Sequence, residues 1–294
     1  MSPSVSVIIN YHNAQEYLEK SIISVLNQTF TNWEIILFDN FSDDKSLFNI
    51  SKYLNNKNIR YYRSDKFLSL GEARNLALDK TKSDFIAILD SDDLMSPDRL
   101  EKQVEYLISN KQIFLVSSWV KIIDNDDRII TKYNPNYSND EIYQRMAWEN
   151  PIVHSSVMFR KMNNNEKVEY NKNIYYAQDY DFYLSYIQKD NFKILEDYLC
   201  LNRSHDNNLT KSKDYYEIIC LEQISHLQKA KKLNLDEGSR KKNLLSINLN
   251  YLKLSIYYLR LFKFKKSFIY LSKLNVNIFK ILLHIGPVRR YFGN

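Results

Sequence analysis

Short apolar runs alternate with helical patterns over the first hundred residues. The runs are rich in β-branched and aromatic residues, as buried strands are. They cover residues 5–9, 34–38, 59–62 and 85–89. Between them, apolar residues recur every three or four positions, as at Leu18, Ile22 and Val25, which predicts amphipathic helices. Strands and helices that alternate at these lengths predict an α/β fold with a mainly parallel sheet covered by helices on both faces.

The pattern is less regular after residue 110. Strands are predicted over residues 113–119, 129–133 and 153–160, and a helix begins at Gln178. From Tyr215 to about Leu283, large apolar residues are interleaved with lysine and arginine, which predicts a helical region.

The charge of the chain divides it into two parts. Residues 211–294 hold 17 Lys+Arg and 5 Asp+Glu, whereas the residues before them hold 24 and 30. This asymmetry indicates two regions with different roles. We expect a large domain over residues 1–212, with halves at 1–100 and 101–212, and a basic helical region over residues 213–294.

Polar side chains follow three of the predicted strands. Asn10 to Asn13 come after the first strand, Asp39 after the second, and Asp90 to Asp93 after the fourth. Ligands of open α/β sheets bind beyond the carboxyl ends of the strands. We therefore expect the three clusters to share one rim and to form the functional site.

The glycine content excludes two common nucleotide-binding motifs. Only four glycines occur in the chain, so the sequence contains neither a glycine-rich phosphate loop nor a dinucleotide-binding fingerprint. If the chain binds a nucleotide phosphate, a metal and side chains must replace those loops.

The acidic cluster at residues 90–93 predicts a cation site. Three carboxylates within four positions repel one another unless a cation or solvent relieves them. Oxygen ligands of this kind suit Mg²⁺ or Mn²⁺. The alternative is that Asp92 or Asp93 caps the helix that follows.

Five stretches resemble glycosyltransferase family 2, in the family's order and spacing. They are Val5 to Asn13, Ser24 to Phe30 with Trp33 and Glu34, Asp39 to Asp44, Ala73 to Asn75, and Ile88 to Asp93 with Pro97 to Leu100. Residues 178–184 and 203–210 resemble later family motifs more weakly. The resemblance implies a GT-A fold, with a Rossmann-like, mainly parallel sheet and here a C-terminal helical extension. It also implies an inverting glycosyltransferase that depends on a nucleotide-sugar.

The resemblance implies a donor site on the predicted rim. Asn10, Tyr11 and His12 match the loop that lies against the nucleotide, and Asp39 matches the carboxylate that binds the base, which implies a UDP-sugar. Arg74 matches an arginine near the donor diphosphate; a surface salt bridge is its alternative.

The acidic cluster matches the DxD element of the family. Asp90, with Ser91, falls on the nucleotide side, and Asp92 matches the acid that binds Mn²⁺ or Mg²⁺. His205 resembles a histidine of a late loop that approaches the metal or diphosphate, with a packing role as its alternative. Asp93 is then left as a helix-start residue.

Asp179 matches the family's general base, which takes the proton of the acceptor hydroxyl. Its alternative role is a helix N-cap. Gln178 departs from the family pattern, which has glutamate at that position. His154 matches a segment on the acceptor side.

These matches predict sugar transfer to a glycan or lipid-linked glycan acceptor in lipopolysaccharide or capsule synthesis. A metal-dependent nucleotidyltransferase is one alternative, although that class typically has a glycine-rich loop after its first strand. A non-catalytic nucleic-acid binder would explain the basic tail but not the acidic rim, so we expect no nucleic-acid partner.

The basic region has two interpretations. Aromatic and basic residues together, as in Phe262 to Lys266, suit peripheral contact with an anionic membrane. The alternative is a helical bundle that packs on the catalytic domain or on a second subunit in a homodimer. With no signal-peptide pattern and no span of roughly 20 apolar residues, we expect a cytoplasmic protein, peripheral on the inner face of the plasma membrane if the first interpretation holds.

Overall fold

The computed structural model describes residues 5–163, 166–205 and 215–274. The chain forms two compact units, Met1–Ser212 and Lys213–Asn294. The expected motif at Asn208 to Thr210 and the helical stretch beyond residue 274 lie outside the described residues.

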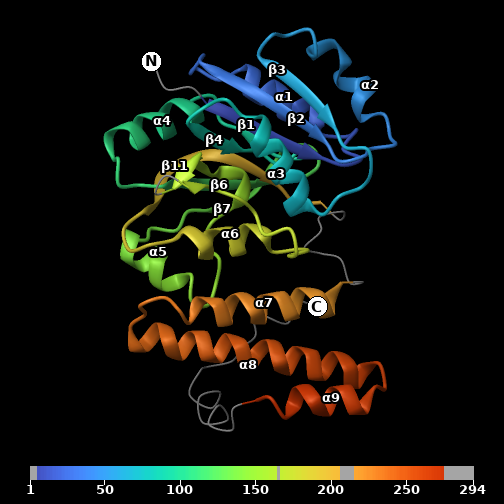
Figure 1. Ribbon diagram of the computed structural model, residues 1–294, viewed down its shortest axis with the longest axis vertical. Helices are drawn as coiled ribbons and strands as arrows, with labels where there is room; N and C mark the ends of the chain where they lie inside the picture. The colour runs from blue at the N-terminus through green and yellow to red at the C-terminus, as the bar shows by residue number, and fades with distance from the viewer. Residues whose placement is uncertain (1–4, 164–165, 206–214, 275–294) are drawn as a thin grey trace. The chain divides into compact units, whose positions relative to one another are not determined.

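Four parallel strands form the first half of the sheet in unit 1 (Figure 1). They are β1 (Val5–Tyr11), β2 (Trp33–Asp39), β3 (Ile59–Arg63) and β4 (Phe85–Ile88). They lie in the order β3, β2, β1, β4 and match the four apolar runs. Helices connect and cover them: α1 (Leu18–Leu26), α2 (Ser46–Ile50), α3 (Leu70–Lys80) and α4 (Arg99–Ser109). The expected mainly parallel sheet flanked by helices is confirmed.

The second half of the sheet is mixed. It comprises β5 (Leu94–Met95), β6 (Leu115–Ile123), β7 (Ile129–Tyr133), β8 (Met158–Arg160) and β11 (Phe192–Arg203). Strand β8 is antiparallel to β4 and β6 and so joins the two halves, while β11 runs parallel to β6. A separate pair, β9 (Met162–Asn163) and β10 (Glu166–Lys167), and helices α5 (Asn139–Arg145) and α6 (Gln178–Tyr186) complete the unit.

Two local expectations were wrong. Residues 153–157 do not form a strand, because His154–Ser156 is a 3-10 turn whose carbonyl groups accept hydrogen bonds from α4 side chains. The acidic cluster does not start a helix either: β5 follows it, and α4 begins only at Arg99. The helix-cap alternative for Asp92 and Asp93, and the helix-start role left to Asp93, therefore do not hold.

Unit 2 consists, in its described part, of α7 (Tyr216–Ala230), α8 (Glu237–Arg260) and α9 (Phe264–Leu271). A core of Cys220, Ile224, Leu227, Ile247 and Leu254 holds α7 against α8. Among the helices that the structure describes, none is long and apolar enough to cross a membrane.

A close backbone approach fixes helix α3 next to the segment that precedes α6. A Cβ atom on Gly71 would lie 2.7 Å from the carbonyl oxygen of Asn171, which is closer than real Cβ contacts. The contact atom is backbone, so the two segments must separate to accept any side chain. Glycine at this position therefore allows the two halves of unit 1 to meet.

We expect Gly71→Ala to lower the free energy of unfolding of unit 1 by about 1–3 kcal/mol, because overpacking displaces the backbone. Urea denaturation followed by tryptophan fluorescence measures this, since all three tryptophans lie in unit 1. Gly238→Ala, in α8 of unit 2, is the control and should leave this transition unchanged. Equal transitions for the two variants would contradict the packing argument.

Candidate functional site

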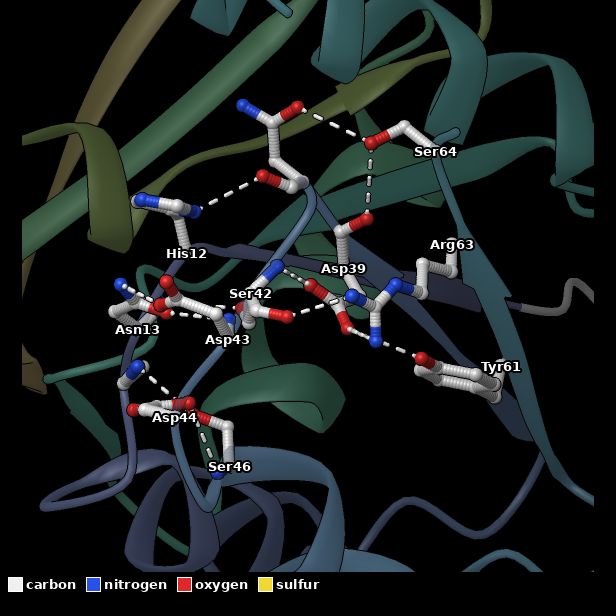
Figure 2. Close-up of polar contacts among 12 residues, drawn as sticks. His12, Asn13, Asp39, Ser42, Asp43, Asp44, Ser46, Tyr61, Arg63 and Ser64 are labelled. Atoms are coloured by element: carbon white, nitrogen blue, oxygen red, sulfur yellow. Dashed lines mark hydrogen bonds and ion pairs between the residues drawn. The ribbon is translucent and has the colours of Figure 1, made fainter. Parts of the chain in front are cut away.

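Asp39 ends β2 with its carboxylate fully buried. One oxygen accepts the backbone N–H of Ser42 at 2.7 Å, and the other accepts the Tyr61 hydroxyl at 3.0 Å (Figure 2). The Arg63 guanidinium lies 3.7 Å from the second oxygen. Tyr11 pairs with Asp39 across β1 and β2, and burial, followed by the charge of Asp39, raises the pKa of Tyr11. The carboxylate is therefore held in one orientation.

Several hydrogen bonds join the loops after β1 and β2. The backbone N–H of Asn13 donates to Ser42 Oγ at 3.0 Å, and the Asn13 amide exchanges bonds with Asp43 at 2.8 and 3.0 Å. His12 Nδ1 lies 3.0 Å from the Asn40 carbonyl oxygen. Figure 2 shows these contacts on one side of the Asp39 carboxylate. Two of the three expected polar clusters are therefore in contact.

The three carboxylates of the acidic loop have different surroundings. Asp93 is 1% exposed and accepts bonds from the Arg203 N–H at 2.6 Å and the Asn202 amide at 2.7 Å. Asp92 keeps 27% of its side chain exposed, with Oδ2 2.9 Å from His205 Nε2. Asp90 Oδ1 is 3.5 Å from the Arg74 guanidinium. Only Asp92 combines an open carboxylate with a second ligand-type side chain.

Burial raises the pKa of both Asp90 and Asp93. For Asp90 the positive charge of Arg74 opposes the rise, whereas for Asp93 the charges of Asp92 and Asp90 add to it. The carboxylates of this loop therefore repel one another, and a bound cation would relieve that repulsion.

Two further arginines, both completely buried, support the acidic loop. Arg203 donates to the Asp92 carbonyl oxygen at 2.8 Å and to the Asp124 carbonyl oxygen at 2.6 Å, and forms an ion pair with Asp127 at 2.6 Å. Arg99 donates to the carbonyl oxygens of Ile88 and Val157, both at 3.0 Å, below the loop. Burial lowers the pKa of Arg99 to about 10, so this side chain stays charged at neutral pH.

Arg74 links the acidic loop to the first turn of α6. It is 7% exposed, so the surface-salt-bridge alternative does not describe it. One terminal nitrogen donates to Gln178 Oε1 at 3.1 Å, and the other faces Asp90. The Gln178 amide nitrogen donates to the Tyr175 carbonyl oxygen at 2.8 Å. Both ends of the Gln178 side chain are thus engaged inside the protein.

Asp179 lies next to this contact, in the first turn of α6. The N-cap of α6 is Ala177, so Asp179 is not the cap. Burial raises the pKa of Asp179, and the positive charge of Arg74 opposes that rise. Asn150 Nδ2 donates to Asp179 Oδ2 at 3.0 Å and orients the carboxylate. These features suit a carboxylate that accepts a proton.

His154 is buried between two tyrosines behind Asp179. Its Nδ1 is 2.8 Å from the Tyr183 hydroxyl, and its Nε2 is 3.4 Å from the Tyr170 hydroxyl. Burial holds the pKa of His154 well below its usual range, so the ring is neutral. Both ring nitrogens of His154 face tyrosine hydroxyls, so these contacts give the side chain a packing role inside unit 1.

The residues present fit a divalent cation bound together with a diphosphate. Among the described residues no three His, Cys, Asp or Glu side chains form a metal-binding group. Mg²⁺ and Mn²⁺ often use only one or two protein carboxylates and complete their shell with phosphate oxygens and water. Asp92, with His205 beside it, supplies such an incomplete site.

Some of the side chains that support the site were not expected from the sequence. The structure places Asn10 to His12 beside Asp39, and Asp90 beside Arg74 and Gln178. No role was expected for Asn150 or Arg99. For Arg99 a signal existed, because it belongs to the Pro97 to Leu100 stretch that resembles the family. Asn150 has no such signal, because only the fold brings it to Asp179.

We expect Arg203→Met to lower the free energy of unfolding of unit 1 by roughly 2–4 kcal/mol, because it leaves buried carbonyl groups and Asp127 without their partner. Tryptophan-monitored urea denaturation measures the change. The control is Arg128→Met, whose side chain is 77% exposed and pairs with Asp126; it should change stability by less than about 0.5 kcal/mol. The support role is wrong if Arg203→Met costs no more than the control.

Comparisons with known proteins agree with this geometry. The family model described as "Glycosyl transferase family 2" matches residues 6–169. An uncharacterised glycosyltransferase of Methanocaldococcus jannaschii is 36% identical over 218 residues, which span 72% of this chain and 75% of that protein. The Escherichia coli enzyme named UDP-Glc:alpha-D-GlcNAc-diphosphoundecaprenol beta-1,3-glucosyltransferase is 33% identical over 129 residues, which span 44% of this chain and half of that enzyme.

The fold has a close parallel among solved structures. A mannosyltransferase of Pyrobaculum calidifontis, solved with GDP-Man and Mn²⁺, superposes with a TM-score of 0.61 at 15% identity, covering 97% of this chain and 79% of that one. This likeness shows the GT-A fold. With the family match over more than half of the chain, it leads to one conclusion: the chain belongs to glycosyltransferase family 2.

Proposed function

We propose that this glycosyltransferase moves a sugar from a UDP-sugar to a hydroxyl of a glycan or lipid-linked glycan, with inversion, in the synthesis of a cell-surface polysaccharide. One observation carries the proposal: buried Arg74 joins Asp90 of the acidic loop to Gln178, the residue before Asp179. A donor-side carboxylate and a candidate base therefore belong to one connected site. The name of the E. coli relative, a UDP-Glc-dependent enzyme with a lipid-linked acceptor, supports the choice of substrates.

On the donor side, Asp39 and the loop of Asn10 to His12 would receive the nucleotide. Asp39 is fixed by Ser42 and Tyr61 and keeps further acceptor capacity, and because its carboxylate is fully buried, a base N–H would reach it only after a covering group moves. Asp90 and Ser91 would lie on the ribose side. Arg74 would face the diphosphate, where its charge opposes that of the phosphate groups.

On the acceptor side, Asp179 would act as general base. Asn150 donates to Oδ2, and we propose that the incoming hydroxyl approaches Oδ1. As the acceptor oxygen bonds to the anomeric carbon from the side opposite the diphosphate, its proton passes to Asp179. The bond from the anomeric carbon to the diphosphate oxygen then breaks and its electron pair leaves with the nucleoside diphosphate. A single displacement of this kind inverts the anomeric configuration.

We propose Mn²⁺ or Mg²⁺ as the cofactor, with Asp92 as ligand and His205 beside it. The Mn²⁺ complex of the Pyrobaculum mannosyltransferase supports a metal in this fold. A divalent cation there would neutralise the charge that develops on the leaving diphosphate. Asp93 would not bind it, because both of its oxygens accept bonds from Arg203 and Asn202.

Contact with an anionic membrane and homodimerisation, both expected for the basic region, stay predictions. The same holds for the sugar, the acceptor and the site of action.

A screen of nucleotide-sugars with and without Mn²⁺, measuring release of nucleoside diphosphate, tests the proposed reaction. We expect turnover with a UDP-sugar that requires the metal and falls at least about a hundredfold in Asp92→Asn, because charge stabilisation of the leaving group is lost. The matched control is Asp98→Asn, a partly exposed aspartate that pairs with Lys102. Release of pyrophosphate from nucleoside triphosphates instead would indicate nucleotidyl transfer, and metal-independent turnover would refute the cation role.

The pH profile tests the base. Burial already raises the pKa of Asp179, and Asn150→Ala removes a hydrogen bond that stabilises its charged form, so this pKa should rise further. Because the base works only when deprotonated, we expect the acidic limb of kcat/KM to move to higher pH by about one unit. Asn173→Ala, an exposed asparagine before α6, should leave the limb in place. An unmoved limb in Asn150→Ala would argue against Asp179 as the base.

A further inference from the structure

The turn between α8 and α9 carries a cluster of exposed apolar side chains. Phe262 is 80% exposed, Phe264 62% and Phe268 69%. Leu261 and Leu271 are also exposed. We call these five residues the tip surface. Exposed phenylalanines at this density are unusual on a soluble helix pair and mark an interaction site.

The packing of α9 on α8 keeps the tip surface turned outward. Ser267 Oγ lies 3.0 Å from Ser255 Oγ, and the Tyr270 ring stacks on Tyr258 with centroids 5.7 Å apart. Phe264, Phe268 and Leu271 are spaced four and three residues apart, so they share a different helical face from this packed pair. The two helices run side by side in Figure 1. Within the described part of unit 2, the packing of α9 on α8 therefore leaves these apolar side chains exposed.

Phe262 is presented by an unusual backbone conformation. Its φ is 55°, in the left-handed region that bulky residues rarely adopt. A glycine or asparagine would suit this turn better. The chain instead places a large ring there, at the most exposed point of the tip surface.

Basic side chains surround the tip surface. Arg260, Lys263, Lys265 and Lys266 are exposed, and no aspartate or glutamate occurs in the sequence after Glu237. Residues 238–294 hold 12 Lys+Arg and no acid. Lys266 extends along the Tyr258 ring, with Nζ 3.2 Å from the hydroxyl. Aromatic side chains bordered by lysines are the pattern of helices that insert shallowly into a charged interface.

We infer that the tip surface docks on an anionic lipid bilayer, with the phenylalanines in the acyl boundary and the lysines at the headgroups. Charge decides against a second copy of the chain, because a symmetric contact would bring two unbalanced basic surfaces together. This inference goes beyond the proposed sugar transfer, since binding to lipid does not depend on donor or acceptor.

Co-sedimentation of the full chain with vesicles tests the inference. Vesicles of phosphatidylglycerol and phosphatidylcholine should bind the protein, and vesicles of phosphatidylcholine alone should bind it far less. Phe262→Ser/Phe264→Ser/Phe268→Ser should lower the partition coefficient about tenfold or more. Lys263→Gln/Lys265→Gln should lower it roughly tenfold to thirtyfold on anionic vesicles only.

The matched controls carry the same number of apolar-to-serine and lysine-to-glutamine substitutions at exposed residues of unit 1. They are Phe48→Ser/Ile129→Ser/Ile130→Ser, at residues that are 78%, 53% and 58% exposed, and Lys57→Gln/Lys111→Gln. Both controls should bind vesicles as the unsubstituted chain does. Circular dichroism checks that every variant keeps its helices.

Two results would overturn the inference. One is equal vesicle binding by the tip variants and the controls. The other is a dimer, seen by sedimentation velocity, that the triple phenylalanine variant dissociates without a change in vesicle binding. Sugar transfer is measured in parallel as release of nucleoside diphosphate with a water-soluble acceptor. Transfer without vesicle binding would refute only the membrane docking. Vesicle binding without transfer would refute only the proposed function.

Discussion

Repulsion among three carboxylates within four residues of one loop is the constraint on which the site depends. Asp90, Asp92 and Asp93 follow a buried strand, and burial raises the pKa of the first and third. The fold answers with buried arginines from different elements. Arg74 pairs with Asp90, while Arg203 and Arg99 bind backbone oxygens of the loop and of the strands beneath it. Of the three, Asp92 has a partly exposed carboxylate with a second ligand-type side chain, His205, beside it, which is the kind of incomplete site that Mg²⁺ and Mn²⁺ use.

The same arrangement connects three separate elements of unit 1. Arg74 comes from α3, Asp90 from the loop after β4, and Gln178 from α6. Any shift of α6 therefore moves Asp179 relative to the acidic loop. Glycine at position 71 allows α3 to approach the segment before α6, so backbone packing also fixes the spacing of these elements. Gln178 is neutral and contacts Arg74 on one side, while Asp90 pairs with Arg74 on the other.

The sequence predicted the part of the fold that follows from local pattern. The strands β1 to β4 coincide with apolar runs, and the polar loops after β1 and β2 are in contact because the carboxyl ends of parallel strands share a rim. Strand β11 was not predicted from the sequence. Register shifts between Leu195 and Cys200 interrupt the alternation of buried and exposed side chains by which a strand is recognised. Residues 153–157 have strand-forming composition, but hydrogen bonds from Arg99 and Gln103 bend them into a turn. Contacts such as Asn150 with Asp179 depend on tertiary structure and have no local signature.

We propose that the acidic loop holds a nucleoside diphosphate through a divalent cation at Asp92. Calorimetric titration of UDP into the protein, with and without Mn²⁺, addresses it without any knowledge of the sugar or acceptor. We predict that Mn²⁺ tightens UDP binding at least about tenfold, and that Asp92→Asn abolishes this gain while leaving metal-free binding unchanged. Equal affinity of the unsubstituted chain for UDP with and without Mn²⁺, or an undiminished gain in Asp92→Asn, would contradict it.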